Sequence, residues 1–160
     1  MAVTADEFKK ALQYWASGVT VVTANSPKLG LQGMTVSAFC SVSAEPPQIL
    51  VCLNEAADTG EGILQSGCFA VNVLEKAQQG ISNQFAGGCS HEDRFANSPW
   101  IAGDTGAPLL AESLMSLDCT LVDRVKAGTH WIVIGEVQAV VCREGEPLLY
   151  YRGAYRQLNA

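Results

Sequence analysis

The 160 residues have the length of one domain, and we expect residues 1–160 to form a single domain. An apolar fraction of 48% allows a substantial core, whereas the charged fraction of 16% lies well below the roughly 25% of an average soluble protein. Part of the surface is therefore expected to be covered by a second subunit or by a ligand. The net charge of −6, with only scattered cations, argues against nucleic acid as a partner.

The cysteines indicate a reducing compartment. Five of the six lie in apolar runs, as free buried cysteines do, and none forms a C-x-x-C pair, so we expect a cytoplasmic protein with no metal site. They are Cys40, Cys52, Cys68, Cys89, Cys119 and Cys142. The first residues are polar and acidic, unlike a signal peptide, and no apolar run approaches the ~20 residues of a membrane span, which predicts no membrane partner.

The first third of the chain predicts one helix followed by strands. Thr4 and Glu7 form a capping box, and apolar residues recur at helical spacing up to Trp15, so a helix is expected to run from Thr4 to a stop at Gly18. The remaining elements are a strand over 19–24, a turn over 25–30 and strands over 31–43 and 48–54. Pro46 and Pro47 make the corner between the last two strands, because proline offers no N–H to a sheet.

The strand expected over 31–43 alternates strictly between two kinds of side chain, which a strand directs to opposite faces. One face is small and apolar, with Val36, Ala38, Cys40 and Val42. The other face carries four hydroxyls around one aromatic ring, with Thr35, Ser37, Phe39, Ser41 and Ser43. Short hydroxyls of this kind can receive a planar polar ligand, although an ordinary solvated strand face is the alternative interpretation.

The rest of the chain is mostly strands. The expected elements are a helical turn over 59–65, a strand over 68–74, a helix over 77–86, one long loop over 87–108, and strands over 114–125, 130–142 and 148–155. Turns are expected over 126–128 and 144–147. About seven strands with short turns and a few short helices predict a mostly β protein, an antiparallel β-barrel. A structureless loop as long as 87–108 is usually functional or interfacial.

Both histidines are weighed as functional residues. His91 lies in the long loop beside two acidic residues, and we expect it to be a solvated loop residue. His130 opens the most apolar strand, on the same face as Ile132 and Ile134, which are expected to point into the barrel. His130 is either a hydrogen-bonding group at the mouth of a pocket or a plain strand-end residue.

Aromatic residues beside arginines suggest a place for a ring or a phosphate. Arg94 and Phe95 lie together in the long loop, where a surface ion pair is the alternative. Tyr151 and Tyr155 belong to a segment rich in tyrosine and arginine near the C-terminus, which suits either a ligand rim or a subunit contact. No nucleophile elbow, P-loop or dinucleotide fingerprint is present, so a bound cofactor is expected to supply the chemistry.

Taken in order, these segments resemble the short-chain flavin reductases, the reductase components of two-component flavin monooxygenases. The similar segments extend over essentially the whole chain and include residues 18–23, 33–47, 51–54, 71–74, 85–87, 94–95, 128–130 and 150–152. The resemblance implies an FMN-binding split barrel of Greek-key type and a homodimer with flavin near its interface. It also implies reduction of FMN or FAD by NADH or NADPH, with delivery of the reduced flavin to a separate oxygenase. A flavin- or haem-binding carrier or sensor of the same fold is the alternative.

The resemblance also implies the site residues. For flavin they are Thr35, Val36, Ser37, Ala38, Cys40, Ser41, Val42, Ser43, Cys52, Leu53, Asn54, Thr59, Phe85 and Ala86. For the nicotinamide nucleotide they are Arg94, Phe95, Tyr151, Tyr155 and His130, of which His130 is the candidate catalytic residue. Thr59 is the only hydroxyl in the stretch where many relatives carry several for the flavin phosphate. The neighbouring Asp58 carboxylate would repel a phosphate if it pointed inward. The phosphate contact and the choice between FMN and FAD therefore stay open.

Overall fold

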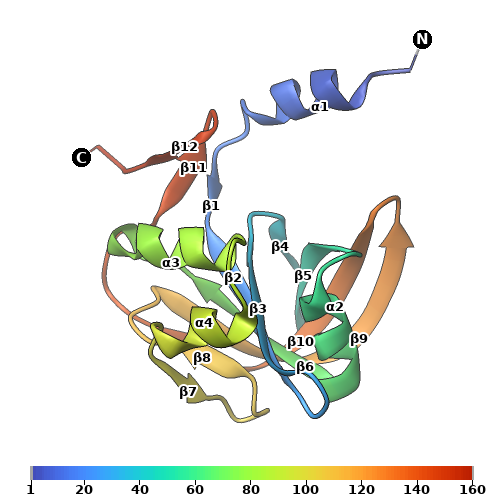
Figure 1. Cartoon of the computed structure of the whole chain (residues 1–160), viewed down its shortest axis with the longest axis vertical. Coiled ribbons are helices and arrows are strands. Elements are labelled where there is room, and N and C mark those ends of the chain that lie inside the picture. Colours follow the sequence, from blue (N-terminus) through green and yellow to red (C-terminus); the bar gives the residue numbers. More distant parts are fainter. Residues whose placement is uncertain (1, 160) are drawn as a thin grey trace.

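The computed structural model describes residues 2–159 and consists of a curled antiparallel sheet with short helices around it (Figure 1). The helices are α1 (Ala5–Leu12), α2 (Asp58–Ser66), η1 (Lys76–Gln78), α3 (Gln79–Phe85) and α4 (His91–Ala96). The strands are β1 (Ser17–Gly18), β2 (Thr20–Ser26), β3 (Gly30–Val36), β4 (Phe39–Ala44), β5 (Pro47–Asn54), β6 (Cys68–Val73), β7 (Trp100–Ala102), β8 (Pro108–Leu110), β9 (Met115–Ala127), β10 (His130–Cys142), β11 (Leu149–Tyr151) and β12 (Ala154–Arg156).

Seven strands form the main sheet in the order β3-β2-β6-β9-β10-β5-β4. The two edge strands, β3 and β4, are joined by only two residues, so the sheet must curl until its edges meet at that end. This arrangement confirms the expected split barrel. Its interior is filled by a cluster that includes Val22, Val51, Phe69, Val71 and Val133.

The strand expected over 31–43 is instead two strands, because the backbone bends at Ser37 and Ala38. The N–H of Phe39 donates to the Ser37 carbonyl (3.0 Å), and the N–H of Cys52 donates to the Ala38 carbonyl (3.0 Å). β3 therefore pairs with β2, whereas β4 pairs with β5. The strict alternation in the sequence could not reveal this bend, and a register shift between Ser41 and Ser43 interrupts the alternation a second time.

The expected N-terminal helix is confirmed, but it is shorter than the spacing predicts. Thr4 accepts from the N–H of Glu7, and the Glu7 carboxylate accepts in return from the N–H of Thr4. The helix ends at Leu12, and Gly18 belongs to β1. No side chain of α1 is buried, and the helix stands away from the barrel beside the β11–β12 hairpin (Figure 1).

The long loop expected over 87–108 contains ordered elements, so that expectation is wrong. Ser90 caps α4 by accepting from the N–H of Asp93, and β7 pairs with β8. The fully buried carboxylate of Asp118 on β9 accepts hydrogen bonds from the N–H and the hydroxyl of Thr105. The short elements α4, β7 and β8 depend on contacts with β3 and β9, so hydrophobic periodicity along the sequence does not predict them.

Ile132 and Ile134 lie on the outer face of β10, not inside the barrel as expected. Val133 and Gly135 face the interior, where an added Cβ on Gly135 would come 2.5 Å from the Phe69 ring. The turn before β10 is also tighter than expected and consists of Gly128 and Thr129 alone. Apolar residues on both faces of β10 conceal which face the barrel encloses.

All six cysteines are free, as expected, but their burial differs. Cys68 and Cys119 are buried, whereas Cys40 and Cys142 are exposed despite their apolar neighbours in the sequence. Burial, followed by the charge of Asp118, raises the pKa of the Cys119 thiol to about 12. Within residues 2–159, no helix is long and apolar enough to cross a membrane.

Candidate active site

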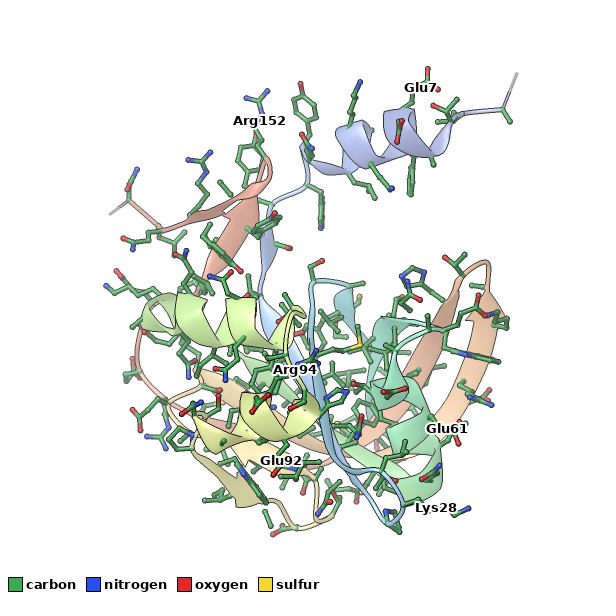
Figure 2. The ribbon with its side chains drawn as sticks, in the orientation of Figure 1. Glu7, Lys28, Glu61, Glu92, Arg94 and Arg152 are labelled. Carbon is green, nitrogen blue, oxygen red and sulfur yellow. The ribbon has the colours of Figure 1, made fainter. Side chains whose placement is uncertain are left out.

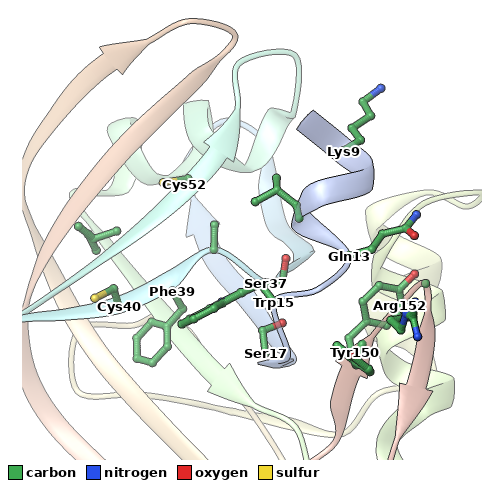
Figure 3. Close-up of a pocket in the computed structure, with 15 residues that line it drawn as sticks. Lys9, Gln13, Trp15, Ser17, Ser37, Phe39, Cys40, Cys52, Tyr150 and Arg152 are labelled. Atoms are coloured by element: carbon green, nitrogen blue, oxygen red, sulfur yellow. The ribbon is translucent and has the colours of Figure 1, made fainter. Parts of the chain in front are cut away.

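A groove of about 600 Å³ lies between the barrel and the N-terminal and C-terminal segments of the chain (Figure 3). One wall comes from the bend between β3 and β4 and from β5; the opposite wall comes from α1, the turn after it and the β11–β12 hairpin. The lining residues are Lys9, Leu12, Gln13, Trp15, Ser17, Ser37, Ala38, Phe39, Cys40, Leu50, Cys52, Tyr150, Tyr151, Arg152 and Gly153. Its volume is in the range of sites that hold a small organic molecule.

The bend at Ser37 and Ala38 is what opens the barrel-side wall. Cys40 pairs with Leu50 across the two strands, so these side chains and that of Cys52 share the outer face of the sheet. Desolvation raises the pKa of the Cys52 thiol above its ordinary value. The barrel-side wall therefore presents thiol, hydroxyl and aliphatic groups without a charged side chain. It also includes the backbone of Ser37 and Ala38, which lies between β3 and β4 and belongs to neither strand.

The opposite wall is held together by Arg152, at the tip of the β11–β12 hairpin (Figure 2). Its N–H donates to the Gln13 carbonyl (3.1 Å), and its guanidinium carbon lies 4.9 Å from the centre of the Tyr14 ring. The tip is a tight turn in which Arg152 and Gly153 both have positive φ, 52° and 73°. Through these contacts the hairpin fixes the end of α1 over the groove.

The charge of the groove is opposite to that of the protein. The net charge is −6, yet among residues 2–159 the only charged ones that line the groove are Lys9 and Arg152, both cations. A groove with this lining favours an anionic ligand with a substantial apolar or aromatic part.

The structure brings together five of the residues that the sequence indicated. Ser37, Ala38, Cys40, Cys52 and Tyr151 all line the groove. Lys9, Trp15 and Arg152 also line it and were missed. No sequence signal could have found Lys9 and Trp15, because the walls meet only when the two ends of the chain come together on the barrel. Arg152 lies in the segment rich in tyrosine and arginine that suggested a ligand rim, although it was not itself named as a site residue.

Several other indicated residues do not line the groove. The side chains of Val36, Leu53, Phe85 and Phe95 are buried in the core, where they cannot touch a ligand in the groove. Thr35 donates its hydroxyl to the Ser82 carbonyl (2.6 Å), Ser43 accepts from the N–H of Glu45, and Asn54 accepts from the N–H of Ala56. Ser41, Val42 and Ala86 are exposed outside the groove lining. The Thr59 hydroxyl is fully buried and has no hydrogen-bond partner in the described chain.

Arg94 and His91 both act on Gly33, so the expectation that His91 is a solvated loop residue is wrong. Arg94 points from α4 into the molecule (Figure 2) and donates to the Gly33 carbonyl (2.6 Å), while Nδ1 of His91 accepts from the N–H of Gly33 (3.1 Å). An added Cβ on Gly33 would lie 2.6 Å from the Phe85 ring, so α4 and α3 can approach β3 closely only at this glycine. Arg94 thereby donates to the backbone carbonyls of Gly33 and Cys89, and its contact with a nucleotide stays a prediction.

His130 and Tyr155 lie outside the groove lining. His130 is exposed next to Thr129, whose hydroxyl is 3.0 Å from Nδ1, and it pairs with Asn54 across β10 and β5. Ile132, two residues further along β10, pairs with the groove residue Cys52. His130 therefore lies on the same outer face as Cys52, at the start of β10. The Tyr155 hydroxyl is hydrogen-bonded with Ser82 (2.8 Å) and Asn83 (2.9 Å).

The split barrel is the fold of flavin reductases of known structure. The chain belongs to the flavin reductase like domain family, whose model matches residues 12–159. It is 40% identical over 158 residues to FMN reductase (NADH) RutF 2 of Methylorubrum extorquens, covering 98% of this chain and 91% of that relative.

Two solved structures share the fold across nearly their full length. The NADH:FAD oxidoreductase SgcE6 of Streptomyces globisporus, in complex with NAD and FAD fragments, has a TM-score of 0.90 and 30% identity, covering 99% of this chain and 97% of that one. BorF, the flavin reductase component of a bacterial two-component tryptophan halogenase, has a TM-score of 0.89 and 31% identity, covering 98% of this chain and 99% of that one.

Proposed function

We propose that the protein is a flavin reductase that transfers a hydride from NADH to FMN, giving NAD⁺ and reduced flavin after uptake of one proton. The observation that carries this proposal is the groove. In the described part of the chain its charged lining residues are cations, and its barrel-side wall is neutral and partly apolar. Such a lining suits a planar ring attached to a phosphate. The names of the relatives, FMN reductase (NADH), favour FMN and NADH over FAD and NADPH.

The flavin, when bound, supplies the electron-accepting ring. The protein would orient the flavin and nicotinamide rings and exclude water from the groove. Hydride transfer requires two stacked rings at near-attack distance and no nucleophile from the protein. Leu12, Phe39 and Leu50 give the groove apolar surface that keeps water from the reacting atoms. Lys9 and Arg152, which line the groove, would hold phosphate groups of the ligands.

A second copy of the chain is part of the proposal. The outer face of β5, β9 and β10 carries Leu50, Val125, Ile132 and Ile134, and Val125 is 47% exposed. This apolar face continues from Cys52 at the groove, because Cys52, Ile132 and Val125 form one row across the three strands. A homodimer that buries this face would place the groove beside the subunit boundary and would account for the small charged fraction.

The reduced flavin would pass to a separate oxygenase. BorF is described as the flavin reductase component of a two-component tryptophan halogenase, and another structural neighbour as nitrilotriacetate monooxygenase component B. Both descriptions support a partner that consumes reduced flavin. A carrier or sensor would bind flavin or haem without turnover, so turnover discriminates between the two.

The experiment that tests the proposal is a matrix of initial rates. NADH or NADPH oxidation is followed with FMN, with FAD and without flavin. The proposal expects NADH oxidation that depends on added flavin and is faster with NADH than with NADPH. A protein that binds flavin but oxidises neither nucleotide is a carrier, and the proposal is then wrong.

A further inference from the structure

Trp15 exposes an unusually large aromatic surface. Its side chain is 77% exposed, more than any other large apolar side chain in the described part of the chain. A tryptophan ring offers a large area of apolar contact to any molecule that covers it. The exposure cannot be attributed to a frayed end, because the N–H of Trp15 donates to the Leu12 carbonyl (3.1 Å) in the turn after α1.

The ring lies in the groove. Trp15 lines it together with Ser17 and with Ser37 and Phe39 from the bend of the barrel-side wall (Figure 3). Figure 3 labels Trp15 and Phe39, which line the groove from the α1 side and from the bend, respectively. The turn that carries it is anchored by the bond from the N–H of Arg152 to the Gln13 carbonyl, so the ring is presented by a fixed backbone.

The ligand that fits this arrangement is planar and anionic. Lys9 and Arg152 are the charged lining residues that the structure describes, and the groove has a volume of about 600 Å³. Indole is electron-rich, and an oxidised isoalloxazine ring is electron-poor, so the two stack favourably. A nicotinamide ring is smaller and would cover less of the indole.

We propose that Trp15 stacks on the isoalloxazine ring of the flavin and is a positioning residue of the groove, outside the set of residues that the sequence indicated. This inference rests on the proposed function. Loss of the indole is expected to weaken FMN binding by about two- to tenfold, the range of one aromatic pair. Phenylalanine, which retains a ring, should restore most of the affinity.

The first test measures FMN affinity by ultrafiltration, without turnover, for Trp15→Ala, Trp15→Phe and the matched control Trp131→Phe. Trp131 packs against the barrel core and under Arg124, away from the groove lining. The expected order of dissociation constants is wild type and Trp131→Phe lowest, Trp15→Phe close to them and Trp15→Ala highest. Denaturant midpoints should be equal for the Trp15 variants and the wild type, because the side chain is exposed.

The second test uses Trp15 as the sole tryptophan, in a protein with Trp100→Phe and Trp131→Phe. Collisional quenching by acrylamide should be strong without flavin and should fall when FMN saturates the groove. Unchanged affinity in Trp15→Ala, or a Trp15 ring already shielded without flavin and unaffected by FMN, would overturn the inference and mark Trp15 as a subunit contact. Those results leave flavin-dependent turnover intact; a wild type that binds neither FMN nor FAD contradicts the proposed function itself.

Discussion

His91 and Arg94 hold the edge of the sheet by the two backbone polar groups of one residue, Gly33. His91 can accept from Gly33 only while Nδ1 is unprotonated. Burial, followed by the nearby charge of Arg94, lowers the pKa of His91 from its ordinary 6.5, against an opposing effect of the Asp58 carboxylate. α4 is therefore expected to lose this contact in acid.

The pH dependence of stability tests this contact. The unfolded chain protonates His91 near its ordinary pKa of 6.5 and the folded chain does so at lower pH, so the free energy of unfolding should fall as the pH drops below that value. His91→Asn offers an amide oxygen to the Gly33 N–H and does not titrate. Denaturant midpoints at about pH 7.5 and about pH 5.5 should converge in this variant relative to the wild type. An identical pH dependence in both proteins would contradict the assignment.

His130 is predicted to orient the nicotinamide from the outer face beside Cys52. His130→Ala should raise the KM for NADH or lower kcat by about two- to a hundredfold, the range for one lost hydrogen bond, with little change in FMN affinity. Gln138→Ala, another exposed position on β10, is the matched control. If the variant binds flavin poorly but has normal NADH kinetics, His130 contacts the flavin and not the nicotinamide. If neither changes, His130 contacts no ligand and is a plain strand-end residue.

At the scale of elements, fully buried Asn72 joins strands that are distant in the sequence. Its amide donates to the Val21 carbonyl and the Thr23 hydroxyl, and its oxygen accepts from the N–H of Leu110 and the hydroxyl of Ser116. These bonds connect β6 to β2, β8 and β9. They are part of what holds the short β7–β8 hairpin against the barrel.

Asn72→Ala should destabilise the protein by about 3–5 kcal/mol, because it leaves several buried polar groups without partners. Asn25→Ala, at the one exposed position of β2, should cost no more than about 0.5 kcal/mol. Urea unfolding of both variants measures the difference. Equal, small losses would show that solvent or local rearrangement satisfies these groups.

Most of the elements could be predicted from hydrophobic periodicity and turn residues, including α1 with its cap and strands β5, β6, β9 and β10. The bend at Ser37 and Ala38 could not, because a continuous alternation masks a change of pairing partner that only the closed barrel imposes. The bend is also the reason that the two predicted faces of 31–43 both contribute to the groove. Ser37 and Phe39 come from one face, and Ala38 and Cys40 from the other. The helix α4 could not be predicted for a related reason. Its position depends on its close packing against β3, which is possible only because residue 33 is glycine.

At the scale of the whole molecule, the sequence predicted the fold and five of the fifteen residues that line the groove. The barrel-side wall belongs to one continuous segment and its neighbour, so Ser37, Cys40 and Cys52 could be identified. The opposite wall depends on contacts between Arg152 and the turn after α1, which lie almost the full length of the chain apart. Such long-range placement leaves no local pattern, and Lys9 and Trp15 could not be identified for that reason.

The apolar outer face predicts a homodimer. Sedimentation at micromolar concentration should give twice the mass of the chain, and Ile134→Glu, which puts a charge on that face, should shift the population toward monomer. Leu29→Glu, in the turn between β2 and β3, is the matched control and should stay dimeric. A wild-type protein that is monomeric and still reduces flavin would contradict the proposed homodimer.

Hydride transfer between bound NADH and flavin is the central claim, and anaerobic titration measures it without interference from oxygen. NADH is added in small portions to the protein with excess FMN while the visible absorbance of oxidised flavin is followed. The account predicts that one flavin is reduced for each NADH added, at a rate proportional to the concentration of protein. Flavin that stays oxidised in the presence of protein and excess NADH would contradict it.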